Sequence, residues 1–323
     1  MVDAVSILVI TRDRREMLNR LLGDLYQQKF KGEFEIVVVE ETDDPVPPPG
    51  VRYVPHPVRN RGIAYARNLS LKHADHGLLV FVDDDCRVHP DWLSKLVAPF
   101  EDQTVLGVQG GVTVPEDTNA IGWAETLLGF PGGGFTRVVQ SHGEMQETRE
   151  VSTLNAAYRK EAVITAGGFS DMARFGGEDF LLAKEVAKKG KLYFIPDAEV
   201  RHEARGNLAS IWQWFVRRGR AEVGILKANL APPGYGRFLL GSSLLLKLFV
   251  LLALTPWLGP WPLLLFVLFY VGRLWYRFRW FFSYDRVPAA AVWVLPVVKV
   301  CMDLASDAGR ISVWPGRGVS DGK

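Results

Sequence analysis

Three consecutive acids are the residues most suggestive of chemistry. Asp83, Asp84 and Asp85 directly follow the apolar run Leu78–Val82. Three adjacent carboxylates repel one another unless a cation neutralises them, and hard cations such as Mg²⁺ and Mn²⁺ prefer carboxylate oxygens and bridge to phosphates. The acidic triplet therefore predicts a divalent-metal site, with a solvated acidic turn as the alternative. A diphosphate ligand would account for it, because a bound metal reverses the local charge.

A second acidic pair, Glu178 and Asp179, precedes the helical pattern of Phe180–Lys189. A positioned carboxylate that takes a proton from an attacking hydroxyl accelerates such a step by about 10²–10⁴-fold. Asp179 is the first candidate for this general base and Glu178 the second. The alternative is that the pair only caps the start of a helix.

The elements that must position these acids alternate between strand and helix patterns. This order predicts an α/β fold with a mainly parallel sheet flanked by helices. Ligands of such sheets bind beyond the carboxyl ends of the strands. Polar clusters at Thr11–Asp13, Glu40–Asp44 and Asp83–Asp85 occupy those ends, so we expect one site. The expected strands are Val5–Ile10, Phe34–Val39, Val51–Val54 and Leu78–Val82, and the expected helices are Arg15–Gln28 and Ile63–His73.

Composition divides the chain into two unlike parts. The 323 residues carry a net charge of +2, which predicts no nucleic-acid partner. Residues 223–323 carry +7, which leaves −5 for residues 1–222. Two cysteines exclude a disulfide framework. The first apolar run is followed, not preceded, by arginines, so it predicts a strand and not a signal peptide, and we expect residues 1–222 to be cytoplasmic.

The basic part predicts a membrane module over residues 223–323. No Asp or Glu occurs between Val223 and Tyr284, a window that contains the apolar segments Leu239–Leu258 and Pro262–Tyr276. Arginines on both sides and an uncharged turn predict a helical hairpin over about 239–276 with both ends in the cytoplasm. Two core helices of a soluble domain are the alternative. Residues 287–310 are shorter and interrupted by Pro296, which favours a re-entrant or interfacial segment over the alternative of a third span.

Residues 208–222 predict an interfacial helix at the end of the first part. Tryptophans at headgroup depth and arginines on lipid or acceptor phosphates would account for their composition. A basic amphipathic anchor is the alternative. The residues concerned are Trp212, Trp214, Arg217, Arg218 and Arg220.

Several segments, in order, resemble the family 2 glycosyltransferases, in a membrane-anchored form of prokaryotic type. The resemblance spans nearly all of residues 5–202. It implies the GT-A fold, a Rossmann-like domain that binds nucleotide sugars, followed here by transmembrane or interfacial helices. The matching segments are Val5–Arg14, Phe34–Glu41, Asn60–Asn68, Phe81–Asp85, Gly167–Phe169, Gly176–Leu182 and Ile195–His202.

The resemblance also implies roles for individual residues. Thr11 and Glu41 would hold the base of the nucleotide, and Arg67 would lie near the nucleotide or its phosphates. The family usually has Asp where Glu41 stands, so a UDP-sugar is favoured while GDP- and dTDP-sugars stay open. Asp83 and Asp84 would contact the nucleotide sugar. The ligands of a Mn²⁺ or Mg²⁺ ion would be Asp83, Asp85 and His202.

The expected function is inverting, metal-dependent transfer of one hexose to a hydroxyl of a lipid-linked or membrane-proximal glycan, by a multi-pass protein of the cell membrane. The alternatives are a polyprenyl-phosphate sugar synthase, a processive polysaccharide synthase and an inactive scaffold. Processive polysaccharide synthases have a pattern of Gln, two residues, Arg and Trp at this place. Residues Gln213–Arg218 depart from that pattern, which puts long-chain synthesis in doubt. Ser152–Ala156 would shape the donor pocket, and Gly111–Glu150 is either an acceptor-facing loop or a surface insertion.

Overall fold

The computed structural model describes residues 2–57, 61–171, 175–229 and 232–313. Asn60 and the last ten residues of the expected membrane module lie outside the described residues. The chain forms two compact units, Met1–Pro115 with Gly129–Glu203, and Glu116–Leu128 with Ala204–Lys323. The second unit therefore starts before residue 223, because helix α8 (Leu208–Asn229) packs along helix α12 (Ala289–Ser312).

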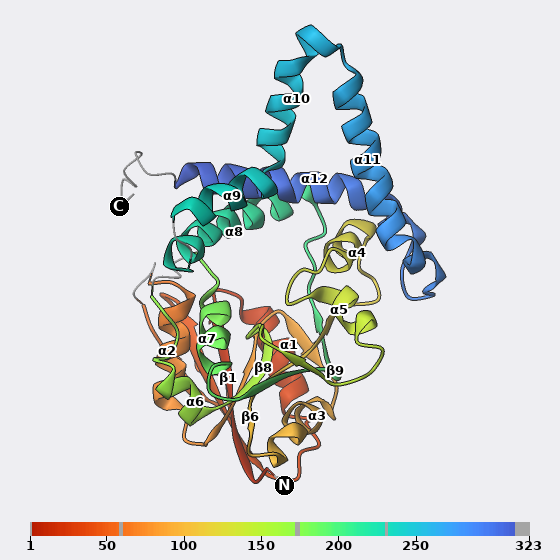
Figure 1. Ribbon diagram of the computed structural model, residues 1–323. Helices are drawn as coiled ribbons and strands as arrows, with labels where there is room; N and C mark the ends of the chain where they lie inside the picture. Colours follow the sequence, from red (N-terminus) through yellow and green to blue (C-terminus); the bar gives the residue numbers. More distant parts are fainter. Residues whose placement is uncertain (1, 58–60, 172–174, 230–231, 314–323) are drawn as a thin grey trace. The chain divides into compact units, whose positions relative to one another are not determined.

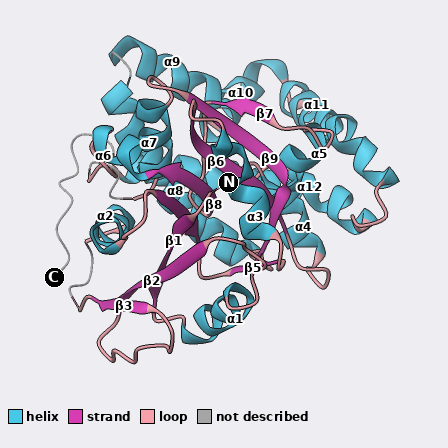
Figure 2. Ribbon diagram, turned by 90° about the horizontal axis from the view of Figure 1, so that it is seen from below, coloured by secondary structure: helices cyan, strands magenta, loops and turns pink. Residues whose placement is uncertain are grey.

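The first unit is built on one mixed sheet (Figure 2). Its described strands lie in the order β3-β2-β1-β4-β8-β6-β9-β5, with β7 paired to β9. Strands β3, β2, β1 and β4 are parallel as expected, whereas β8 is antiparallel to both of its neighbours. The strands are β1 (Ala4–Arg12), β2 (Glu33–Glu41), β3 (Arg52–Pro55), β4 (Leu78–Val82), β5 (Cys86–Val88), β6 (Val105–Thr113), β7 (Gln146–Thr148), β8 (Asn155–Arg159) and β9 (Lys191–His202).

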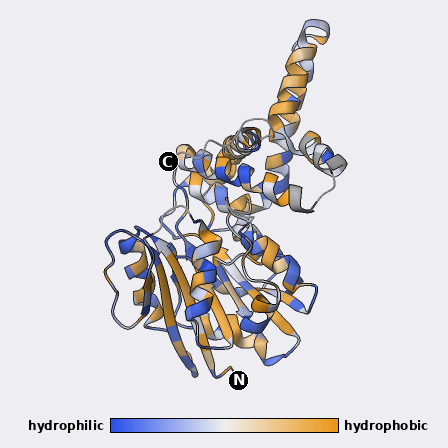
Figure 3. Cartoon of the chain, turned by 90° about the vertical axis from the view of Figure 1, so that its left-hand side faces the viewer, coloured by the Kyte–Doolittle hydropathy of each residue, from blue (hydrophilic) through white to orange (hydrophobic). Residues whose placement is uncertain are grey.

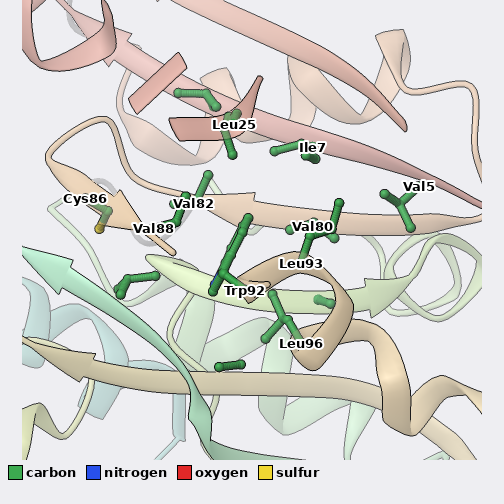
Figure 4. Packing of buried hydrophobic residues seen from close by; sticks show 14 of the residues in the cluster. Val5, Ile7, Leu25, Val80, Val82, Cys86, Val88, Trp92, Leu93 and Leu96 are labelled. Carbon is green, nitrogen blue, oxygen red and sulfur yellow. The ribbon is translucent and has the colours of Figure 1, made fainter. Parts of the chain in front are cut away.

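Helices cover both faces of this sheet, which explains why β4 is a continuous apolar run. Leu78, Val80 and Val82 belong to one buried cluster, whereas Leu79 and Phe81 belong to another. Alternate side chains of a strand point to opposite faces, so both faces of β4 are buried. Figure 4 shows Trp92 and Leu93 in the cluster that contains Val80 and Val82. The helices are α1 (Arg15–Leu25), α2 (Ile63–His73), α3 (Trp92–Val97), α5 (Gly134–Gln140), α6 (Lys160–Thr165) and α7 (Glu178–Val186), with a 3-10 turn at Ala98–Glu101.

The segment Gly111–Glu150 contains regular secondary structure, and its two expected roles, an acceptor-facing loop or a surface insertion, stay predictions. It contains α4 (Ala120–Leu127), α5 and β7, and α4 belongs to the second unit, where it packs on α12. The side chain of Asn119 caps α4, because its Oδ1 accepts from the backbone N–H groups of Ile121 and Gly122 at 3.1 and 3.0 Å.

The second unit is helical. Helices α10 (Leu244–Leu258) and α11 (Trp261–Phe278) form the predicted hairpin, which Figure 1 shows rising from α12 and Figure 3 colours as largely hydrophobic. Helices α8 and α12 pack closely at two glycines. A Cβ on Gly219 would lie 2.1 Å from the Ser306 carbonyl oxygen, and one on Gly309 would lie 2.1 Å from that of Val216. The unit also contains α9 (Pro232–Ser242) and a 3-10 turn at Arg279–Ser283.

Length and composition qualify one described helix as a candidate membrane span, and it is α12. A second candidate is the bent pair formed by Gly236–Ser242 and α10, with 70° between its parts. Helix α12 is one continuous helix, and the re-entrant or interfacial character expected for residues 287–310 stays a prediction. Of the apolar window of α12, 44% is buried, which is typical of a helix that packs on others.

Candidate active site

The carboxyl ends of β1, β2 and β4 bring the predicted acidic cluster together. Thr11 lies opposite Glu40 in the parallel register, and β4 pairs with β1 on its other side. The acidic triplet follows β4 directly, so all three strand ends meet at one edge of the sheet. The backbone N–H of Asp83 donates to the Leu154 carbonyl at 3.2 Å, which joins the triplet to the chain just before β8.

Asp84 faces the protein interior. The Thr11 hydroxyl donates to Asp84 Oδ2 at 2.5 Å, and Arg14 Nη1 donates to Asp84 Oδ1 at 3.2 Å. Burial raises the pKa of Asp84 to about 6, although the hydrogen bond from Thr11 opposes this shift. Asp84 and Thr11 therefore tie the end of β1 to the turn after β4, and the Thr11 hydroxyl is already engaged.

Asp85 and His202 make the part of the site most suited to a cation. Strands β5 and β9 are antiparallel and place Cys86 opposite His202, so Asp85 adjoins the imidazole. Arg14 Nη1 donates to Asp85 Oδ2 at 3.0 Å, while Asp85 Oδ1 lies 3.4 Å from His202 Nε2. Asp85 Oδ1 and His202 Nδ1 are both buried, and neither has a hydrogen-bond partner among the described residues. A buried, unsatisfied carboxylate oxygen facing an imidazole fits a divalent cation.

The protein alone supplies an incomplete coordination shell. Within the described ranges, no group of three or more His, Cys, Asp or Glu side chains is arranged to hold a metal ion. Asp83 is a further candidate donor, since the charges of Asp85 and His202 both act on its carboxyl, whose pKa is raised chiefly by burial. Mg²⁺ and Mn²⁺ sites commonly combine one or two carboxylates with substrate phosphates and water. The residues present fit such a site.

Arg67 joins the acidic triplet to the second acidic pair. It lies on α2, and its side chain is 4% exposed. Its Nη2 donates to Asp83 Oδ1 at 3.3 Å, and its Nη1 donates to Glu178 Oε1. The ring of Phe169 packs 5.7 Å from the guanidinium carbon. Both sides of the guanidinium are thus bound to carboxylates.

The first turn of α7 presents two carboxylates in different environments. Gly176 and Gly177 precede it with φ of +121° and +90°, a conformation that favours glycine. Glu178 is buried, and burial raises its pKa to about 7 against the opposing charge of Arg67. Asp179 is half-buried, and its Oδ1 accepts from the Phe180 N–H at 2.8 Å. Asp179 is thus the more accessible carboxylate, and its negative charge acts on Glu178, Arg67 and Asp83.

Comparison with known proteins identifies the first unit. Residues 6–166 match the model of glycosyl transferase family 2. The chain belongs to glycosyl transferase family 2. The matched range contains the acidic triplet and Arg67 and ends before α7, so the placement of Glu178, Asp179 and His202 depends on the geometry described above.

Individual relatives agree with the family. The succinoglycan biosynthesis protein ExoM of Rhizobium meliloti is 31% identical over 180 residues, 54% of this chain and 54% of that protein. The glucosyl-dolichyl phosphate glucuronosyltransferase of Haloferax volcanii is 25% identical over 139 residues, 42% of each chain. The alignments thus span about half the length of these curated relatives.

A solved structure shows the same fold. The mannosyltransferase PcManGT from Pyrobaculum calidifontis, in complex with GDP-Man and Mn²⁺, has a TM-score of 0.58 and 22% identity. The match covers 97% of this chain and 88% of that one. The fold is therefore of the GT-A type expected for family 2.

Arg14 of this family 2 site was not predicted, and it contacts Asp84 and Asp85, as described above. Asn155 lies in the segment Ser152–Ala156 that was expected to shape the donor pocket, but its structural contacts were not predicted. The Asn155 amide nitrogen donates to the Gly111 and Ala198 carbonyls, each at 2.8 Å, while Asn155 Oδ1 accepts from Trp92 Nε1 at 3.0 Å. This buried Asn fixes the start of β8 beneath the acidic triplet. The hydrogen-bond partners of Asn155 are distant in sequence, so local patterns do not reveal these contacts. For Arg14, the arginine-rich run Arg12–Arg15 directly after the first strand could have indicated a role.

The predicted phosphate-binding residues of the family 2 chain lie on α8 in the second unit. The Arg205 guanidinium packs over the Trp214 ring at 4.3 Å, Arg218 lies 3.4 Å from Glu222, and Arg220 donates to the Ser312 hydroxyl at 3.0 Å. These contacts stabilise α8. A role in binding phosphate stays a prediction for the α8 residues, which are Trp212, Trp214, Arg217, Arg218 and Arg220. Glu41 in the first unit lies 3.8 Å from Arg12, and its role in holding a base also stays a prediction.

Proposed function

We propose that this family 2 protein is an inverting glycosyltransferase that moves one hexose from a nucleotide sugar to a hydroxyl of a lipid-linked or membrane-proximal glycan. The observation that carries the proposal is the chain of contacts from Asp83 through Arg67 to Glu178 in the first turn of α7, with Asp85 two residues after Asp83. It joins, in one cluster, carboxylates suited to a cation and its diphosphate with a carboxylate able to accept a proton. Transfer to a hydroxyl needs both.

Asp179 is the general base in this proposal. An acceptor hydroxyl must lose its proton as it attacks the anomeric carbon from the side opposite the departing diphosphate, which inverts that carbon. Asp179 is the accessible carboxylate of the pair, whereas Glu178 is buried and bound to Arg67. The geometry thus supports Asp179 over Glu178.

Asp85, Asp83 and His202 would hold a Mn²⁺ or Mg²⁺ ion. A bound cation of this kind stabilises the charge that develops on the departing diphosphate. Arg14 holds Asp85 Oδ2, which leaves Asp85 Oδ1 directed at His202. Thr11 and Glu41 lie at the base end of the site, with a UDP-sugar as the favoured donor and a GDP- or dTDP-sugar as the other candidates. Asp84 supports this end through its hydrogen bond from Thr11.

The proposal includes attachment to the cell membrane through the α10–α11 hairpin, as a multi-pass protein with the catalytic unit on the cytoplasmic side. Both helices expose large apolar side chains to an extent that water disfavours, for example Phe249 at 65%, Leu268 at 69% and Phe269 at 67%. No acidic residue lies between Val223 and Tyr284. Trp212, Trp214, Arg217, Arg218 and Arg220 of α8 would then lie near lipid or acceptor phosphates.

A panel of nucleotide sugars tests the activity on the full chain in detergent. A metal-dependent thermal shift and donor hydrolysis identify the donor, and Asp179→Asn then tests the base. We expect transfer to a hydroxyl acceptor to fall by about 10²–10⁴-fold, while the donor-induced thermal shift is kept. Glu185→Gln, on the exposed side of the same helix, is the matched control.

Three outcomes would contradict parts of the proposal. Transfer by Asp179→Asn at the wild-type rate would show that the base is wrong and would favour a polyprenyl-phosphate acceptor, whose anionic oxygen needs no base. A long polymer would indicate a processive synthase. The absence of any shift with every donor and either metal would favour a catalytically inactive scaffold.

A further inference from the structure

The ion chain Asp83–Arg67–Glu178 links two positions 95 residues apart in sequence. Its central guanidinium is 4% exposed and the Glu178 side chain 3% exposed, whereas the Asp83 side chain is 31% exposed. Arg67 is therefore shared between a carboxylate that can meet ligands and one that is buried. Glu178 Oε2 is also buried and has no hydrogen-bond partner in the part of the chain that the structure describes.

This arrangement makes Arg67 a competitor for any cation at the acidic triplet. Arg67 Nη2 donates to the Asp83 carboxylate, and a divalent ion bound by Asp83 would use the same carboxylate. The charge of Glu178 balances that of Arg67, and electrostatic interactions between buried groups are strong because water screens them little. Without that charge, the positive potential of Arg67 at the triplet would increase and cation binding would weaken.

We infer that Glu178 is a positioning residue that sets the metal affinity of the acidic triplet through Arg67, and that cation binding is thereby coupled to the first turn of α7, which carries Asp179. This inference rests on the proposed function, because it takes the triplet as a metal site. It assigns Glu178 a role that needs no contact with donor or acceptor. Two sites coupled in this way influence each other reciprocally.

Mn²⁺ binding, followed by electron paramagnetic resonance on the full chain in detergent at about pH 8, tests the coupling without any turnover. Glu178→Gln keeps the shape of the side chain and removes its charge. We expect its dissociation constant for Mn²⁺ to rise about tenfold, the effect of one nearby charge on an ionic equilibrium. Arg67→Gln should bind Mn²⁺ more tightly than the wild type.

The double variant Arg67→Gln with Glu178→Gln separates charge coupling from structural damage. If charge is responsible, removing both partners restores Mn²⁺ affinity to the wild-type value or better. If the double variant binds as weakly as Glu178→Gln, or if Glu178→Gln binds as the wild type does, the inference is wrong. Glu185→Gln should change nothing.

The experiment also distinguishes failure of the inference from failure of the proposed function. Mn²⁺ binding by the wild type with equal affinity in all variants overturns only the coupling. No Mn²⁺ binding by the wild type, with or without a nucleoside diphosphate, overturns the metal site and the coupling together. Unfolding temperatures within a few degrees of the wild type establish that each variant is folded.

Discussion

The two units of this chain differ in how much large apolar side-chain surface they expose. In the sheet unit, Leu79 and Val80 are fully buried, and the acidic triplet lies at the strand ends. In the helical unit, Asp307 is only 2% exposed, whereas Leu268 on α11 is 69% exposed. Water disfavours the exposure of large apolar side chains, so this difference is what the proposed membrane attachment through the hairpin would require.

The ion clusters of the two units also differ in how completely they are satisfied. In the helical unit, Arg310 donates to Glu222 at 2.6 Å and to Asp307 at 2.9 Å, and Asp307 accepts from the Leu245 N–H at 2.9 Å. In the sheet unit, buried atoms of Asp85, His202 and Glu178 lack partners among the described residues. The satisfied cluster holds helices together, and the unsatisfied one is prepared for ligands.

The largest predicted effect comes from opposite substitutions in the two units. Leu79→Ala should lower the stability of the sheet unit by about 4 kcal/mol, because a buried leucine in a central strand leaves a cavity that cannot collapse. Leu268→Asp should leave the sheet unit unchanged and release the protein from liposomes, because a carboxylate in the bilayer is costly. Hydrogen exchange of the β4 amides measures the first effect, and liposome flotation measures the second.

The two variants serve as controls for each other. Leu79→Ala should float with liposomes as the wild type does, and Leu268→Asp should keep the exchange rates of β4. If Leu268→Asp still floats, the hairpin is not the membrane attachment. If it unfolds the helical unit instead, α11 is a core helix of a soluble domain.

A smaller effect is expected from the satisfied ion cluster. Arg310→Gln leaves the Asp307 carboxylate buried without its cation, which should destabilise the helical unit by about 3 kcal/mol. Hydrogen exchange of the α12 amides measures this. Arg218→Gln removes a second, more exposed cation of the same Glu222, with a side chain 41% exposed, and should cost well under about 1 kcal/mol. Equal effects would contradict a buried, structural role for Arg310.

Local sequence patterns predicted the elements of the sheet unit well as far as β4, whereas the later strands β5 to β9 were not predicted. Residues 63–73 and 78–82 form a helix and a strand with the expected bounds, because apolar spacing reports directly which face is buried. The antiparallel insertion of β8 was not predicted, since strand order depends on pairing between distant segments. The same limit applies to α4, which joins the helical unit from the middle of the sheet unit's sequence.

The acidic triplet was located from sequence, but the division of labour within it was not. Three identical side chains face three directions, with Asp83 toward Arg67, Asp84 toward Thr11 and Asp85 toward His202. Moreover, Arg14 and Arg67 place positive charge beside the triplet, whereas the prediction from the triplet alone had only a metal ion to neutralise it. Side-chain direction at a strand end depends on partners from other strands, which local patterns do not reveal.

The smallest predicted effect is a pH dependence that only the unsatisfied cluster should show. Glu178 has a pKa of about 7 in the folded chain, raised mainly by burial, against an ordinary value of 4.5. Between these values the folded chain keeps a proton that the unfolded chain has released, so stability falls as pH rises through this range. From about pH 5 to about pH 6.5 the loss should be on the order of 1–2 kcal/mol.

Glu178→Gln should remove this part of the pH dependence, because the amide does not titrate, and thermal unfolding at the two pH values measures it. Glu185→Gln is the matched control, since Glu185 lies on the same helix, exposed and paired with Lys188, which lowers its pKa. Folding therefore favours the ionised form of Glu185, and Glu185→Gln should not reduce the decline of stability with rising pH. A decline of equal size in Glu178→Gln would mean that Glu178 stays ionised beside Arg67 throughout, and that the two clusters differ in their unsatisfied atoms but not in their protonation.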